Sequence, residues 1–256
     1  PSVPTGGSAE RGTGQPAGAE TFERRRQEAL ELLANWNGEM GEHDPEPLIY
    51  AAWVQTLQKR LIVDELGNLS NELTRLRPDF IEAVFRNENG AQVWCDIKQT
   101  TPVETCQQMA ELSLDEALLR LEEKYGGNIS RWRWGTAHQA LHKAPVLGRI
   151  PVVSWFANIR QETPGGDNTL LRGATRGTGS APFTNVHGSG FRAVYDFSDL
   201  DSSVMIIATG QSGHLLSPHY DDLAALWRRG EYIPMTLDAD VARGGAVGIT
   251  QLTPKP

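Results

Sequence analysis

The chain has 256 residues, 39% of them hydrophobic and 22% charged, with a net charge of −8 at pH 7. This length allows a buried core, and the composition excludes global disorder. The negative charge argues against nucleic-acid binding, which requires a basic face, and no apolar run approaches the ~20 residues that cross a bilayer. The first residues contain no basic stretch followed by an apolar core, so they predict no signal peptide.

The first half of the chain is predicted to be mainly helical. Residues 1–19 are rich in Gly, Pro, Ser, Ala and Thr, which predicts a linker or a surface loop. Apolar side chains at helical spacing, with Gly or Pro near the ends, then predict helices over about 20–36, 48–66, 78–85 and 103–125. Residues 20–130 are therefore interpreted as one helical region.

The pattern changes in the second half, residues 131–256. From Trp132 to Gly190 the chain is rich in Gly, Pro, Trp, His and Asn, which predicts a long irregular segment of the kind that often carries function. Residues 191–197 alternate, which predicts a strand that buries Phe191, Ala193, Tyr195 and Phe197 on one face. Residues 204–208 are apolar on both faces, which predicts an interior strand. A covering helix is expected from near Ser217 to Gly230.

The two predicted strands should form an antiparallel hairpin, which is barely stable alone. The interior strand needs a neighbour on its far side, and only the weak pattern of residues 246–252 offers one. The sequence therefore predicts an α+β fold with a helical first half, an irregular segment and a hairpin. The sheet of this hairpin is expected to be completed by polypeptide that is not in this sequence.

Two groups of residues resemble catalytic or metal sites. His138 and His142 have the i, i+4 spacing of a metal site on a helix, but Gln139 replaces the Glu of a zinc peptidase and no third ligand is evident, which favours packing or hydrogen bonding. Ser212 and His214 lie near Asp residues. The second glycine of Gly210-Gln211-Ser212-Gly213 is one place early for a nucleophile elbow, so a tight turn is favoured.

The remaining motifs contain residues that either have a structural role or line a cleft. Asp167 and Asn168 follow Gly165-Gly166, which is consistent with an anion-binding nest, although a structural turn is favoured. His187 precedes the first predicted strand and either lines a cleft or, as favoured, is buried and hydrogen-bonded. Gln211 and His219 belong to the motifs after the second strand. We assign none of these residues to catalysis, metal binding or a cofactor.

Cys95 and Cys106 are the two cysteines of the chain. Their separation is too large for a CxxC motif, and no suitably spaced Cys or His completes a zinc set. They form either one disulfide around Pro102 or two buried thiols. The spacing leaves both open.

Several strings, in this order, resemble one family. They are Trp132-Arg133-Trp134-Gly135 with His138-Gln139, Gly165-Gly166-Asp167-Asn168-Thr169, His187-Gly188-Ser189-Gly190-Phe191-Arg192-Ala193-Val194-Tyr195-Asp196, Thr209-Gly210-Gln211-Ser212-Gly213, and Ser217-Pro218-His219-Tyr220-Asp221-Asp222-Leu223 with Leu226-Trp227-Arg228-Arg229-Gly230-Glu231-Tyr232-Ile233-Pro234. The set resembles the C-terminal part of the β-subunit of the penicillin acylase (penicillin amidase) family. Two upstream strings resemble the family as well, namely Leu33-Ala34-Asn35-Trp36-Asn37-Gly38 and Trp94-Cys95-Asp96 with Glu104-Thr105-Cys106. The resemblance therefore covers about residues 20–237.

The resemblance implies an N-terminal nucleophile (Ntn) hydrolase, made as a secreted precursor and cut by autoproteolysis. The Oγ of a Ser at the start of the β-subunit then attacks an amide carbonyl, with its own α-amine as the base. The substrates would be N-acyl compounds such as β-lactam side-chain amides or N-acyl homoserine lactones. The family often binds one calcium ion.

The chain departs from the family pattern at its start, Pro1-Ser2, which does not match the nucleophile. The nucleophile, the oxyanion Asn and the calcium ligands are expected outside this sequence. The chain is therefore predicted to be an inactive fragment, with the other α- and β-subunit segments as partners. The hairpin would belong to an αββα sandwich.

Periplasmic or secreted localisation is implied, which favours the disulfide between Cys95 and Cys106. The alternative is a non-catalytic interaction or structural module derived from the family.

Overall fold

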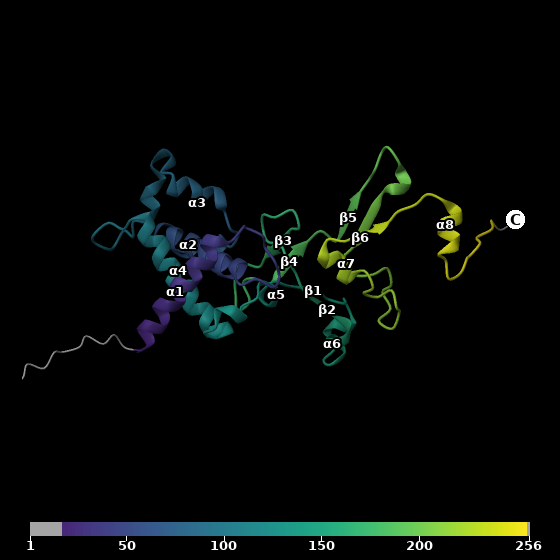
Figure 1. Cartoon of the computed structure of the whole chain (residues 1–256), viewed down its shortest axis with the longest axis horizontal. Coiled ribbons are helices and arrows are strands. Elements are labelled where there is room, and N and C mark those ends of the chain that lie inside the picture. The colour runs from purple at the N-terminus through teal and green to yellow at the C-terminus, as the bar shows by residue number, and fades with distance from the viewer. Residues whose placement is uncertain (1–16, 255–256) are drawn as a thin grey trace, which may run out of the picture.

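The structure is a computed structural model and describes residues 17–254. The molecule is elongated, with a helical lobe at one end, a four-stranded sheet in the middle and a three-stranded sheet toward the C-terminus (Figure 1). The helices of this lobe precede both sheets in the chain, so the predicted α+β class is confirmed.

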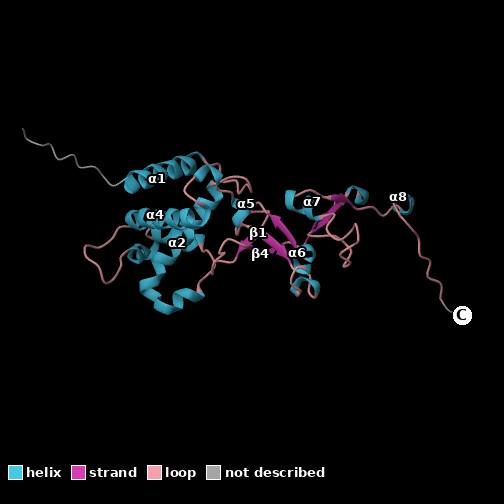
Figure 2. Cartoon of the chain, turned by 90° about the horizontal axis from the view of Figure 1, so that it is seen from below, coloured by secondary structure: helices cyan, strands magenta, loops and turns pink. Residues whose placement is uncertain are grey.

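The helical lobe contains α1 (Ala17–Asn35), α2 (Glu46–Leu66), α3 (Pro78–Phe85) and α4 (Cys106–Tyr125). The four predicted helices agree with these bounds to within three residues at each end. Helix α2 packs along α4, with α1 beside them (Figure 2). Of the predicted linker 1–19, residues 1–16 lie outside the described residues, whereas 17–19 already belong to α1.

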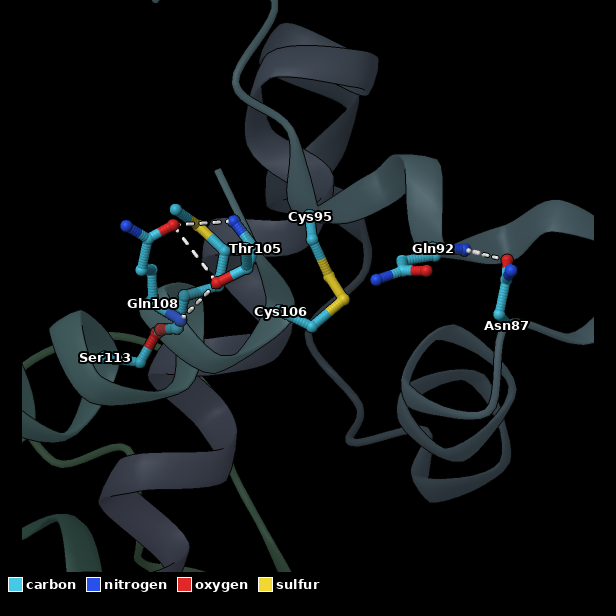
Figure 3. Close-up of a disulfide and its surroundings, with 8 residues drawn as sticks. Asn87, Gln92, Cys95, Thr105, Cys106, Gln108 and Ser113 are labelled. Atoms are coloured by element: carbon cyan, nitrogen blue, oxygen red, sulfur yellow. Dashed lines mark hydrogen bonds between the residues drawn. A yellow bond between two sulfur atoms is a disulfide. The ribbon is translucent and has the colours of Figure 1, made fainter. Parts of the chain in front are cut away.

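The start of α4 is fixed by two local devices (Figure 3). Thr105 forms a capping box, because its Oγ1 accepts a hydrogen bond from the Gln108 amide at 3.2 Å and its own amide donates to Gln108 Oε1 at 2.8 Å. The next residue, Cys106, forms a disulfide with Cys95, the pairing that the resemblance implies. Cys95 is buried in a small core with Leu61 and Met109.

The predicted irregular segment is interrupted by short strands that the prediction missed, because residues 139–188 contain a sheet of strand order β2-β1-β4-β3. Its strands are β1 (Gln139–His142), β2 (Ile159–Glu162), β3 (Gly173–Thr175) and β4 (Asn185–Gly188), with α5 (Trp134–Ala137) before the sheet and α6 (Val153–Ala157) between β1 and β2. Strands β1 and β4 are parallel, and the other two pairs are antiparallel. Each strand has only three or four residues, too few for an alternating pattern to stand out.

The second sheet has the order β5-β6-β7 and contains the predicted hairpin. Its strands are β5 (Phe191–Val194), β6 (Val204–Ile207) and β7 (Ile233–Pro234). The prediction that β6 has no neighbour except residues 246–252 is wrong, since β7 pairs with Val204 and Met205, and 246–252 form no strand. A two-residue strand that contains a proline gives no periodic signal, which explains the error.

The hairpin buries the opposite face from the one predicted. Arg192 lies opposite the fully buried Ile206 and contacts Trp227 of α7 (Ala224–Arg229), so this face is covered around Ile206. The other face carries Phe191, Tyr195 and Phe197, which are 52%, 53% and 89% exposed. The alternating pattern identified the apolar face correctly, but no described residue of this chain buries it.

The covering helix α7 begins at Ala224, later than predicted. The hydroxyl of Ser217 accepts a hydrogen bond from the His219 amide at 3.2 Å, which belongs to a turn and not to a helix cap. The helix ends, as predicted, at Gly230, whose φ is 73°. A final helix, α8 (Ala239–Gly244), is capped by Asp238. In the described part of the chain, none of the helices combines the length and apolarity needed to cross a membrane.

Candidate functional site

A cavity of about 420 Å³ lies between the helical lobe and the loop Gly166–Thr169. Its aromatic walls are Trp36, Tyr50, Trp134 and Phe183. The rings of Trp36 and Tyr50 have their centroids 5.3 Å apart at an interplanar angle of 51°. Helix α2 adds Ala51 and Val54 to the lining. This volume lies within the range of small-molecule sites, about 300–1,000 Å³.

The loop beside this cavity is a structural turn. The Gly165 amide donates to the Met40 carbonyl at 2.8 Å, and the Gly166 amide donates to Thr169 Oγ1 at 2.9 Å. Gly165 has a φ of 80°, and a Cβ there would lie 1.9 Å from the Leu171 carbonyl oxygen, so glycine is required. Because both glycine amides have acceptors within the protein, they do not form the anion nest considered above.

Asp167 and Asn168 both line the cavity. The half-buried Asp167 carboxylate accepts two hydrogen bonds from Thr175, from its amide at 3.0 Å and from its hydroxyl at 2.7 Å. These bonds tie the loop to β3. Asn168 is exposed. The structure therefore places both of these predicted residues at this cavity.

A buried polar cluster lies behind the loop, centred on His138. Its ring stacks on Trp134, and its Nδ1 lies 2.7 Å from the Phe183 carbonyl oxygen. Burial lowers the pKa of His138 to about 4, so the ring is neutral at pH 7 and its Nδ1–H is the donor. Trp134 Nε1 donates to the Gly165 carbonyl at 2.7 Å, which fixes the loop relative to this cluster.

The two histidines with metal-type spacing do not share a helix. His138 follows α5, whereas His142 ends β1 and packs edge-on against Trp227 with ring centroids 5.5 Å apart. Burial also lowers the pKa of His142. Across residues 17–254, we find no group of three or more His, Cys, Asp or Glu placed to hold a metal ion.

The other predicted motif residues lie away from the cavity. His187 is exposed on β4, where a buried position was favoured, because this side of the short strand is not covered. Gln211 is exposed in the segment after β6. His219 is also exposed, and its Nδ1 lies 2.8 Å from Asp222 Oδ2. The structure does not bring these three residues together with Asp167.

Ser212 lies in a turn, as favoured from the sequence. Its Oγ accepts a hydrogen bond from the His214 amide at 3.1 Å, and the Nδ1 of His214 in turn accepts from the Leu216 amide at 3.2 Å. These contacts hold the turn, and none of them places the imidazole as a base for the hydroxyl.

Sequence reasoning missed the aromatic walls of the cavity. Trp36 and Tyr50 lie in predicted helices, and Trp36 also belongs to a string that resembles the family, but neither was predicted to line a site. Trp36 lies at a helix end, far in sequence from the glycine-rich loop but close to it in space. Such a neighbour is recognisable only once the fold is known.

The fold resembles that of a solved penicillin acylase. The thermostable penicillin G acylase of Alcaligenes faecalis matches with a TM-score of 0.51 and 15% identity, over 93% of this chain and 46% of that chain. At this identity the likeness supports a shared fold alone. A family model described as penicillin amidase matches residues 8–243. The chain belongs to the penicillin amidase family.

Curated relatives agree with this family. The acyl-homoserine lactone acylase QuiP of Pseudomonas syringae pv. syringae (strain B728a) is 26% identical over 83% of this chain, which is 26% of the relative. The penicillin acylase 2 proenzyme of Pseudomonas sp. (strain SE83) is 27% identical over 89% of this chain and 29% of the relative. The chain thus spans about a quarter of the length of these relatives.

Proposed function

We propose that this chain is the C-terminal part of the β-subunit of a secreted amidohydrolase that cleaves linear amide bonds of N-acyl compounds. The observation that carries the proposal is the family match over residues 8–243. The relatives named above are acylases for acyl-homoserine lactones and for penicillins, which favours these two substrate types.

In this proposal the nucleophile is an N-terminal Ser on sequence outside this chain, activated by its own α-amine. The oxyanion Asn and any calcium ligands also lie outside. The role of this chain is structural: its hairpin β5–β6 joins a larger sandwich, and its helical lobe supports the walls of the substrate site. The chain alone is inactive.

Uncovered apolar surface supports the presence of partner segments. The exposed hairpin face with Phe191, Tyr195 and Phe197 is one such surface. A second is α6, where Trp155 and Phe156 are 75% and 70% exposed. Large exposed patches of this kind mark interfaces. The disulfide Cys95–Cys106 supports a periplasmic or secreted location, since disulfides persist in oxidising compartments.

The experiment compares the natural full-length precursor with this chain alone. Hydrolysis of N-acyl homoserine lactones and of penicillin G is measured, together with a precursor in which the Ser at the start of the processed β-subunit is replaced by Ala. We expect activity only in the unmodified, processed precursor. Hydrolysis by the 256-residue chain at the rate of the precursor would refute the proposal. An inactive but folded precursor would favour the alternative, a non-catalytic module.

A further inference from the structure

We propose that the cavity between α2 and the Gly166–Thr169 loop binds a compound that combines an aromatic or bulky alkyl group with an ammonium group, and that Asp167 is the counter-ion. This inference rests on the cavity itself and does not depend on amide hydrolysis.

The walls suit the apolar part of such a compound. Trp36 Nε1 donates to the Glu39 carbonyl at 2.8 Å, and Trp134 Nε1 donates to the Gly165 carbonyl at 2.7 Å. Because both indole N–H groups have partners inside the protein, the indoles offer a ligand only apolar and π surface. Aromatic rings attract cations as well as apolar groups, through the negative charge on their faces.

The charge on the cavity wall determines whether a cationic or an anionic ligand should bind. Among the described residues that line the cavity, Asp167 alone has an acidic or basic side chain. In the described part of the chain the Asp167 carboxylate forms no salt bridge, and the nearby ring of His138 is neutral. An ammonium group would therefore neutralise Asp167, whereas a carboxylate would be repelled by it.

The Asp167 carboxylate has capacity for a further donor. It accepts two hydrogen bonds from Thr175, and an ionised carboxylate has about four lone-pair positions. The same two bonds hold the side chain in place before a ligand arrives. Such preorganisation favours binding, because little conformational freedom is lost in the process.

The test uses tryptamine with two analogues of similar shape, neutral tryptophol and anionic indole-3-propionate. Binding is measured by isothermal titration calorimetry on the natural full-length protein. We expect tryptamine to bind about tenfold more tightly than tryptophol, and indole-3-propionate to bind more weakly than both. Failure of tryptamine to bind, or equal binding of tryptamine and tryptophol, would overturn the proposal.

Amino-acid substitutions test whether tryptamine binds in this cavity. Asp167→Asn should abolish the preference for tryptamine over tryptophol. Asp201→Asn should preserve it, since Asp201 also accepts one amide and one hydroxyl bond, from Leu237 and Thr236, outside the cavity. Ala51→Trp fills the cavity from α2 and should abolish binding of all three compounds, with circular dichroism confirming the fold. Retained preference in Asp167→Asn would contradict the proposal.

The result of the binding experiment can be distinguished from the result of the hydrolysis experiment. Binding without hydrolysis would refute the enzymatic proposal alone, and hydrolysis without binding would refute this one alone. If the 256-residue chain binds tryptamine but the full-length protein does not, another segment of the protein occupies the cavity, and the small-ligand site is refuted.

Discussion

His138 lies flat against Trp134, with ring centroids 4.4 Å apart and an interplanar angle of 15°. This pair links the helical lobe to the four-stranded sheet, because Trp134 belongs to the core of the lobe and His138 directly precedes β1. The stack also lies behind the loop that carries Asp167. Substitutions at His138 should therefore change both the stability of the protein and the shape of the cavity.

The pH dependence of stability should report on His138. Burial lowers its pKa from 6.5 to about 4, so the folded state favours the neutral ring. The contribution of the neutral ring to the free energy of unfolding is complete above pH 6.5. It is lost as the pH falls toward 4, because the unfolded state binds the proton more readily than the folded state does. We expect His138→Phe to remove about 3 kcal/mol of pH dependence across this window.

Urea denaturation at several pH values between 4 and 6.5 measures this effect. His187→Phe, at an exposed histidine on β4, is the control for the substitution itself. An unchanged slope in His138→Phe would show that other groups govern stability in this window.

Gly173→Ala should destabilise the protein by crowding the same cluster. The added Cβ would lie 2.5 Å from His138 Nε2 and 2.7 Å from Asn185 Nδ2, both on buried side chains. Overpacking of this kind costs about 1–3 kcal/mol. The double variant with His138→Ala should lose less than the sum of the single variants, because the shortened side chain makes room.

Gly213→Ala is the matched control for this substitution. A Cβ at Gly213 would meet no atom within 4 Å, so the free energy of unfolding should change little. Additive losses in the Gly173→Ala and His138→Ala double variant would contradict the predicted steric coupling.

Removal of the disulfide should destabilise the helical lobe. In the loop-entropy model, a bridge between residues 11 positions apart contributes about 3 kcal/mol. The double variant Cys95→Ala/Cys106→Ala should therefore unfold at lower denaturant concentration, and a reducing agent should shift the parent protein in the same direction. The double variant itself should not respond to the reducing agent; a response would show that the agent acts elsewhere.

The cap of α4 gives a smaller and more local prediction. Thr105→Ala removes the acceptor of the Gln108 amide and should cost about 1 kcal/mol (Figure 3). Thr105→Ser keeps a hydroxyl and should restore most of the loss. Equal stability of Thr105→Ala and the parent would mean that the disulfide at Cys106 already fixes the helix start.

The helices were predictable because their signals are local. Long apolar patterns with helical spacing, and residues such as Pro78 and Gly67 at the ends, lie within each segment itself. The four-stranded sheet was not predictable in the same way. Ala140 pairs with Gln161 on one side and with Asn185 on the other, so the sheet depends on contacts across more than twenty residues.

The candidate site was predictable only on one side. Two glycines marked the loop of Asp167 and Asn168, since the chain must turn sharply there. The opposite wall comes from Trp36 and Tyr50, more than a hundred positions earlier, and no spacing rule connects them to the loop. The proposed function rests on the family resemblance and not on side-chain chemistry.

The uncovered face of the hairpin affects how mutational data on this protein should be read. In a deep mutational scan of the isolated chain, polar residues at Phe191, Tyr195 and Phe197 should be neutral or should improve soluble yield, because water already contacts these positions. If the proposed partner segments cover that face, the same substitutions in the intact precursor should be deleterious. The two scans together would trace, position by position, the boundary between this chain and the proposed partner segments.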